Sequence, residues 1–373
     1  MISARRQIAS LLAILFFSFT LAAQSGRVAP TTTPTPKDDD TERVLTEEIK
    51  LNVLAFDEKG QFFRDVNAED LVITENNVLH QPESVRRLPA NILIVMDTGG
   101  EMRSVKSLDQ TRRVARSLVG SLRAGDSVAL LQYSDRAEIV NEWTTDKRQM
   151  LESINRNTKF GRRSAFVDAL RLAASFLQKD PLENKHLVLI TDGTDSSGNS
   201  SEKFDEFQRL MATDISVHVL SFTALEAADI EPRTKRLSND PPPKAMPDEI
   251  AATLPNGVRP SPSIVKVGPT INMDRTMLKQ IRARKTDLEV SEQQLSKLAE
   301  NTNGEFILPV SVDEMVEKAA VVARMIDAAY VVTYNPKVPV VDTRGIAERN
   351  IEVTSKRTGL TVQARRKLLI SRQ

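Results

Sequence analysis

Two short, almost wholly apolar segments constrain this chain more than any other feature of its sequence. They are NILIVMD (residues 91–97) and HLVLITD (residues 186–192), and each ends in an aspartate. A continuous apolar run of this length is typical of a strand that is covered on both faces, as in a parallel sheet. Such a sheet needs helices on both sides, so the sequence predicts an α/β fold.

The same alternation of strand and helix patterns continues on both sides of these segments. Leu108, Ala115 and Leu122 recur at helical spacing after the first segment, and a second amphipathic pattern surrounds Leu170. The expected helices cover about residues 103–122, 147–155, 166–177 and 202–211, and the further strands are DSVALLQYS, AEIVNEW and ISVHVLSF. We predict a doubly wound, mostly parallel, Rossmann-like sheet over residues 89–333.

Residues 225–288 interrupt this alternation. They contain DPPPK, LPNG and RPSPS and show little periodicity, which predicts an inserted segment without regular structure. After it, SEQQLSKLAENTNG predicts a helix with Ser291 as its N-cap, and EFILP predicts the last strand. A terminal helix is expected to begin at Ser311, with Glu314 completing a capping box.

Short segments of strand texture flank the α/β region on both sides. Residues 46–88 contain IKLNVLAF and DLVITENN, separated by turn signals such as DEKG. At the other end, residues 334–370 contain LTVQAR, in which apolar residues alternate with polar ones. We predict that residues 46–88 and residues 334–370, which belong to the C-terminal segments 334–373, form one small β-sandwich-like module.

The first residues have the pattern of an export signal. Arg5 and Arg6 precede an uncharged apolar run from Ile8 to Leu21, and two alanines follow it. We expect residues 1–23 to be cleaved, residues 24–45 to form a Pro- and Thr-rich linker, and the protein to be periplasmic or secreted. The alternative is an uncleaved anchor in the inner membrane, because the run is only slightly short for a span of roughly 20 residues.

Composition excludes several classes of function. The chain has 51 Lys and Arg against 50 Asp and Glu, so no overall field favours nucleic acid. It has no cysteine, which removes disulfides, thiol nucleophiles and thiolate metal sites. It also lacks the GxSxG, GxxxxGK[ST] and GxGxxG motifs. His186 and His218 lie on predicted strands, where packed histidines are more common than catalytic ones.

Polar residues gather where the carboxyl ends of the predicted strands meet. DTGGE begins at Asp97, RRSAF surrounds Ser164, and DGTD begins at Asp192. Ligands of doubly wound sheets bind at this edge, and carboxylate and hydroxyl oxygens are the ligands that hard divalent cations prefer. The sequence therefore points to a binding site at this edge.

The order of DTGGE, RRSAFVDAL and LVLITDGTD resembles the von Willebrand factor type A domain. With the flanking segments NVLAFDEKGQFF and AYVVTYNP, the chain is more narrowly similar to acidobacterial proteins related to that family. The resemblance implies a metal-ion-dependent adhesion site, in which Asp97 stands for the first Asp, Ser164 for the Thr and Asp192 for the last Asp. It implies a binding module and no enzymatic activity.

The chain departs from the family pattern at two positions. Gly99 and Glu101 stand where the pattern has serines, so two hydroxyl ligands are missing. Glu101 has a carboxylate that can ligate, which gives Asp97, Glu101, Ser164 and Asp192 as candidate ligands of Mg²⁺ or Ca²⁺. The alternative is a site that has lost its metal and serves only as a binding surface.

Each candidate residue also has an ordinary structural role. Asp97 and Asp192 can accept hydrogen bonds from loop amides, and Ser164 can cap the helix that follows it. Arg162, Arg163 and Thr194 lie beside the candidate ligands and are the candidate residues for contact with a partner. For the two arginines taken alone, the residues favour the simpler interpretation of a solvated pair of loop charges.

The sequence therefore favours an exported, non-catalytic module that binds a protein partner at this altered edge, with or without a divalent cation. One alternative is a metal-independent envelope scaffold that binds through the insertion or the β module. A second alternative is an Mg²⁺-dependent phosphoryl-transfer enzyme with Asp97 as its nucleophile. Gly99 weakens that alternative, because haloacid dehalogenase-like enzymes place a second Asp at this position.

Overall fold

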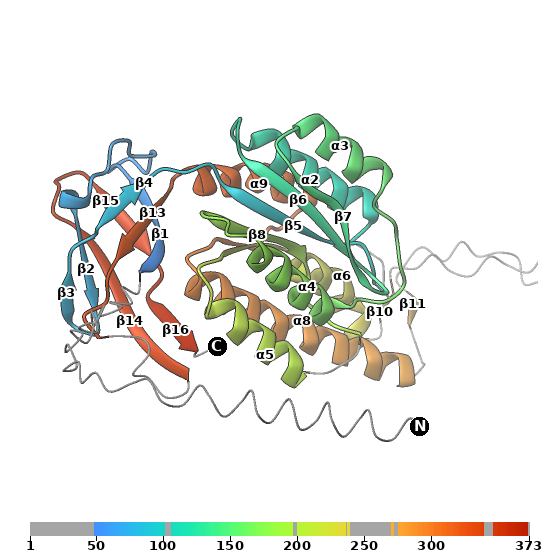
Figure 1. Cartoon of the computed structure of the whole chain (residues 1–373). Coiled ribbons are helices and arrows are strands. Elements are labelled where there is room, and N and C mark those ends of the chain that lie inside the picture. The colour runs from blue at the N-terminus through green and yellow to red at the C-terminus, as the bar shows by residue number, and fades with distance from the viewer. Residues whose placement is uncertain are drawn as a thin grey trace, which may run out of the picture. The chain divides into compact units, whose positions relative to one another are not determined.

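A computed structural model of the chain describes residues 48–100, 106–196, 200–235, 237–238, 270–271, 275–338 and 346–371. The predicted signal and linker and the candidate ligand Glu101 lie outside these residues. Among the described helices, none is long and apolar enough to cross a bilayer. Figure 1 shows a central sheet between layers of helices, with further strands from both ends of the described chain.

The central sheet has six strands in the order β12-β9-β8-β5-β6-β7. Their bounds are β5 Asn91–Asp97, β6 Ser127–Tyr133, β7 Ala137–Thr144, β8 Lys185–Thr191, β9 Ser216–Ser221 and β12 Phe306–Ile307. Only the edge pair β6–β7 is antiparallel, and the other pairings are parallel. The predicted doubly wound, mostly parallel sheet is therefore confirmed.

Helices cover both faces of this sheet because alternate residues of each buried strand point to opposite sides. Ile92, Ile94 and Met96 of β5 pack with one set of helices, while Leu93 and Val95 pack with the other. The first set is α2 Leu108–Ser121, α3 Lys147–Arg156 and α9 Val312–Asp327; the second is α4 Phe166–Lys179, α5 Ser200–Met211 and α8 Arg275–Asn301. Each face thus has its own apolar core.

Eight further strands form two four-stranded sheets, β15-β1-β13-β4 and β16-β14-β2-β3. Their bounds are β1 Ile49–Phe56, β2 Leu71–Glu75, β3 Val78–His80, β4 Ser84–Arg86, β13 Ala329–Tyr334, β14 Ile346–Ser355, β15 Thr361–Ala364 and β16 Lys367–Ser371, with a 3-10 turn at Ala68–Asp70. Leu51, Ile73, Tyr334 and Ile351 share one apolar core. Strands from both ends of the described chain therefore pair with one another, while the exact domain boundaries stay predictions.

The prediction of a segment without regular structure at 225–288 is wrong at both ends of that segment. Helix α6 covers Thr223–Thr234, and α8 begins at Arg275, well before Ser291. Ile230 of α6 packs on Ile281 and Leu288 of α8, so tertiary contact stabilises helices whose own apolar pattern is weak. The short strands β10 Leu237–Ser238 and β11 Thr270–Ile271 also pair, and the residues between them lie outside the described part.

Two predicted helix starts are also corrected. Ser291 is not an N-cap: it lies inside α8, buried, with its hydroxyl donating to the carbonyl of Gly193 at 3.1 Å. Helix α2 begins at Leu108 and not at 103, because Ser107 forms a capping box with Gln110. Lys106 consequently lies in the loop, one residue before this cap.

A pair of buried histidines joins β8 to β9. The amide N–H of Glu305 donates to Nδ1 of His218 at 3.1 Å, so the proton of this ring is on Nε2 and faces Nδ1 of His186, also at 3.1 Å. The proton of His186 is then on Nε2, where it donates to Asn184. Burial lowers the pKa of His218 to about 4, and burial together with the neighbouring His218 lowers the pKa of His186. Both rings are therefore neutral parts of the core.

This pair predicts a loss of stability in acid. Because the folded-state pKa of His218 is below its ordinary value, the stabilisation is complete above about pH 6.5 and is lost as the pH falls towards 4. A shift of this size corresponds to about 3 kcal/mol from His218. Urea unfolding of the wild type and of the double variant His186→Gln/His218→Gln should show a smaller pH dependence in the variant between pH 6.5 and 4. Equal slopes would contradict this account of the pair.

Candidate functional site

Four loops at the carboxyl edge of the central sheet are bonded to one another. We call them the rim: residues 97–100 after β5, 134–136 after β6, 161–165 before α4 and 192–196 after β8. The amide N–H of Gly161 donates to the carbonyl of Thr98 at 3.2 Å, and the amide N–H of Arg163 donates to Oδ1 of Asp135 at 2.9 Å. Two hydrogen bonds of 2.8 Å join Ser164 and Ser196: the Ser164 N–H donates to Oγ of Ser196, and the Ser196 N–H donates to the carbonyl of Ser164. The predicted convergence of the loops that carry Asp97, Ser164 and Asp192 is therefore present, and residues 134–136 join them as a loop that the sequence analysis did not name.

Asp97 and Asp192 face each other across a lysine. Both carboxylates are fully buried, and Nζ of Lys106 lies 2.7 Å from Oδ2 of each. The Lys106 side chain is only 5% exposed. An ammonium group therefore lies between the two carboxylates, in the place where the sequence predicts a divalent cation, and these residues as arranged do not fit a metal ion there. Within the described part of the chain, no three His, Cys, Asp or Glu side chains are grouped so that they could hold one.

The charges of this cluster shift the pKa values of its members in different directions. Burial on its own lowers the pKa of Lys106, but the charges of Asp192 and Asp97 outweigh it and raise that pKa above its ordinary value. Burial acts to raise the pKa of Asp192, and Lys106 and Arg284 more than reverse this, so the pKa of Asp192 is lowered. The pKa of Asp97 is raised by burial and by the charge of Asp192, against the opposing effect of Lys106. Asp192 is thus the firmly ionised member of the pair.

A second cation reaches the cluster from α8. Nη2 of Arg284 lies 3.0 Å from Oδ2 of Asp192 and 3.2 Å from Oε2 of Glu226, which comes from α6. Burial, followed by the charge of Asp192, raises the pKa of Glu226 to about 7, in spite of Lys106 and Arg284. Helix α6 and the first part of α8, neither of which the sequence analysis predicted, therefore supply charged residues to this cluster.

Gly99 is where two backbone segments meet most closely. A Cβ atom at this position would lie 1.8 Å from the carbonyl oxygen of Arg163 and 3.0 Å from Cα of Ser134. Neither atom belongs to a flexible side-chain end, so a serine, as in the family pattern, does not fit here. The loop that carries Arg163 therefore occupies the space that a side chain at position 99 would need.

The hydroxyl of Ser164 links two rim loops and does not cap α4. Its hydroxyl donates to the carbonyl of Thr194 at 2.8 Å, and α4 begins two residues later with Ala165 at its N-cap position. Asp195 instead accepts a hydrogen bond from the first turn of α4: its Oδ2 accepts the amide N–H of Val167 at 2.9 Å. Ser164 therefore links two rim loops and is not the cap of α4.

The three predicted partner-contact residues differ in accessibility. Arg162 and Arg163 are exposed, and neither guanidinium forms an ion pair with any described residue. Thr194 is buried, and its hydroxyl donates to Oδ1 of Asp192 at 2.6 Å while Arg284 donates to it. Thr194 therefore stabilises the cluster from inside, and only the two arginines face outward.

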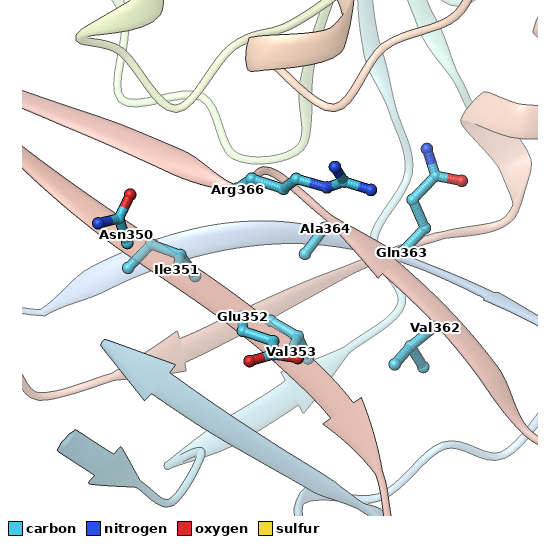
Figure 2. A pocket seen from close by; sticks show the side chains of 8 residues that line it. All are labelled: Asn350, Ile351, Glu352, Val353, Val362, Gln363, Ala364 and Arg366. Carbon is cyan, nitrogen blue, oxygen red and sulfur yellow. The ribbon is translucent and has the colours of Figure 1, made fainter. Parts of the chain in front are cut away.

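A hollow of about 370 Å³ lies beside the rim. Its lining comes from three of the four rim loops and from α4 and α5: Asp135, Arg163, Ser164, Ala165, Val167, Asp168, Asp195, Ser196 and Glu202. A second hollow, of about 470 Å³, lies in the β sheets between β14 and β15 (Figure 2). It is lined by residues 350–353, 362–364 and 366. The first hollow belongs to the rim, and the second is separate from it.

Sequence reasoning did not find Lys106, Arg284 or Glu226. Lys106 is nine residues after Asp97, outside the motif that points to the site, and the other two lie in the segment taken for an unstructured insertion. A lysine shortly before a capping box, on the loop between the first strand and its helix, is the one signal that could have indicated Lys106.

Comparisons with known proteins find similarity to the von Willebrand factor type A domain. The family model of the von Willebrand factor type A domain matches residues 92–194. The pig inter-alpha-trypsin inhibitor heavy chain H2 is 26% identical over 191 residues, which are 48% of this chain but only 20% of that protein. Among solved structures, a von Willebrand factor type A protein from Catenulispora acidiphila (11% identity, 83% of this chain and 75% of that one) has a TM-score of 0.42. An aerotolerance-related membrane protein from Bacteroides fragilis (17% identity, 64% and 98% covered) has a TM-score of 0.38.

The close approach at Gly99 predicts a strongly destabilising substitution. In Gly99→Ala the new methyl group would overlap the Arg163 carbonyl, and we expect a loss of at least about 2 kcal/mol in the free energy of unfolding, measured in urea. Gly120→Ala is the matched control, because nothing lies within 4 Å of its added Cβ and it lies inside α2. The control should gain about 0.5–1 kcal/mol. Equal effects of both changes would mean that the loop is free to move away.

Proposed function

Because residues 92–194 form a von Willebrand factor type A domain, we propose that the protein is a non-catalytic module that binds another protein at the rim. The convergence of the four rim loops at the carboxyl edge of the sheet carries this proposal. Ligands of doubly wound sheets bind at that edge, and loops held on a rigid sheet are common carriers of binding residues.

The outward side chains of the rim suggest the chemistry of the partner. Arg162 and Arg163 are exposed side by side, while their backbone amides are fixed by Asp135. A fixed backbone with free guanidinium groups suits the recognition of carboxylates, which arginine can bind through two parallel hydrogen bonds. We propose that an acidic segment of the partner contacts these two arginines.

The interior of the rim supports a role without catalysis. Asp97, the nucleophile of the phosphoryl-transfer alternative, is fully buried and accepts hydrogen bonds from Lys106 and from the hydroxyl of Tyr133 at 3.0 Å. A fully buried carboxylate bonded in this way is a poor nucleophile for a substrate. The ion pairs of the cluster hold the rim loops in shape instead.

Export is part of the proposal and rests on the first 23 residues, which have the pattern of a signal peptide. A partner in the cell envelope or outside the cell follows from it. The competing interpretation is a scaffold that binds through the β module, and the hollow between β14 and β15 gives that interpretation a definite location.

Charge reversal at the rim tests the proposal. We expect Arg162→Glu/Arg163→Glu to abolish the capture of a partner that the tagged wild-type chain retains from the envelope fraction of its own organism, quantified by mass spectrometry. A loss of about tenfold or more is expected, because each lost charge-assisted hydrogen bond contributes roughly 1.5–3 kcal/mol.

A matched variant serves as the control. Lys356→Glu/Arg366→Glu changes the net charge by the same amount on two exposed residues of the β sheets, one of which lines the second hollow. It should retain the partner. If this variant loses the partner and the rim variant keeps it, binding occurs through the β module, and the rim proposal is wrong.

A further inference from the structure

We propose that Lys106 is a built-in cation that permanently takes the place of the divalent metal, so that the rim of this protein is formed without a metal ion. The inference does not depend on what the rim binds. It is carried by the contacts of the two carboxylates, by the fixed position of the lysine and by the packing at Gly99.

All four carboxylate oxygens of Asp97 and Asp192 already accept hydrogen bonds. Lys106 donates to Oδ2 of both at 2.7 Å. The hydroxyl of Tyr133 and the guanidinium of Arg284 add a second donor to each of these two oxygens, both at 3.0 Å. A metal ion binds lone pairs and not hydrogens, so it could enter only by displacing these donors.

The other two carboxylate oxygens accept hydrogen bonds from backbone amides of their own loops. Oδ1 of Asp97 accepts the amide N–H of Gly99 at 3.1 Å, and Oδ1 of Asp192 accepts the amide N–H of Thr194 at 2.8 Å. The Thr194 hydroxyl also donates to Asp192, so its proton points at the carboxylate. The hydroxyl is therefore oriented as a donor within the cluster.

The charges of the two aspartates are balanced by side chains alone. The cations Lys106 and Arg284 face the two buried aspartates, and Glu226 adds a third, largely buried acidic group whose pKa is raised to about 7. A divalent ion would add two positive charges within a few ångströms of the ammonium, in surroundings where burial strengthens repulsion. Lys106 and a metal ion therefore compete for one place.

The start of α2 also places Lys106. Ser107, the residue directly after it, is the N-cap of this helix. The side chain of Lys106 passes beside Gly100, where an added Cβ would lie 3.7 Å from Cε. The Arg163 carbonyl also occupies the space that a serine side chain at position 99 would need. The loop therefore has room for the lysine side chain but not for a serine at position 99.

Cation binding by the full-length chain tests this inference. Thermal unfolding and isothermal titration are carried out with Mg²⁺, Ca²⁺ and Mn²⁺, each against EDTA and at constant ionic strength. For the wild type we expect no heat of binding and no change in Tm. For Lys106→Ala we expect a saturable heat with Mn²⁺ or Mg²⁺ and a Tm that rises with cation concentration, because removal of the ammonium frees two carboxylate oxygens.

Two further variants locate the effect. Lys106→Ala/Asp97→Asn should lose the acquired binding of Mn²⁺ or Mg²⁺, since one of the freed carboxylates is gone. Lys203→Ala is the matched control: Lys203 is another buried lysine of this region, but it donates to the carbonyl of Gly193 and to Ser291, and its removal frees no carboxylate. It should gain no cation binding.

Several results would overturn the inference. Saturable cation binding by the wild type that disappears in Asp97→Asn would show that a metal enters in spite of the lysine. A folded Lys106→Ala that binds no cation would show that the ammonium does not stand in a metal's place. If Lys106→Ala does not fold, Lys106→Gln, which keeps most of the side-chain volume, is held to the same two criteria.

Discussion

The shared ion pair of Lys106 with Asp97 and Asp192 is the interaction on which the carboxyl edge of this sheet depends. It joins the ends of β5 and β8, two adjacent parallel strands whose aspartates would otherwise be two buried negative charges side by side. Buried ionised carboxylates without a partner are strongly destabilising, so a cation between them stabilises this end of the sheet. In this chain the cation is covalently attached.

An attached cation has different physical consequences from a bound ion. A metal ion can be removed by a chelator and can offer an open coordination position to a partner's carboxylate. An ammonium that already donates to both aspartates offers neither property. Under the proposed function, recognition at this rim therefore falls to outward groups such as Arg162 and Arg163, and the interior contributes shape and rigidity.

The segment after β9 contributes charged side chains to the site. Helices α6 and α8 pack against each other and bring Glu226 and Arg284 to the buried aspartates. Each helix has only a weak apolar face of its own, and their contact with one another and with the sheet stabilises both. A region whose proline-rich centre suggests an accessory loop therefore completes the charged cluster.

The sequence was sufficient to predict the strands of the central sheet and most of its helices, because apolar runs and helical spacing are local patterns, but α6 and the first part of α8 were missed. It also identified Asp97 and Asp192, because polar residues after parallel strands must meet at one edge, and Ser164 through the resemblance of its loop to the family pattern. It did not determine what lies between them. The position of Lys106 depends on where α2 begins, the contact at Gly99 depends on the path of a loop more than 60 residues away, and Arg284 arrives from a helix whose partner is also distant in sequence. Tertiary structure decided these features, because electrostatic and steric contacts between remote segments leave no periodic signal in the chain.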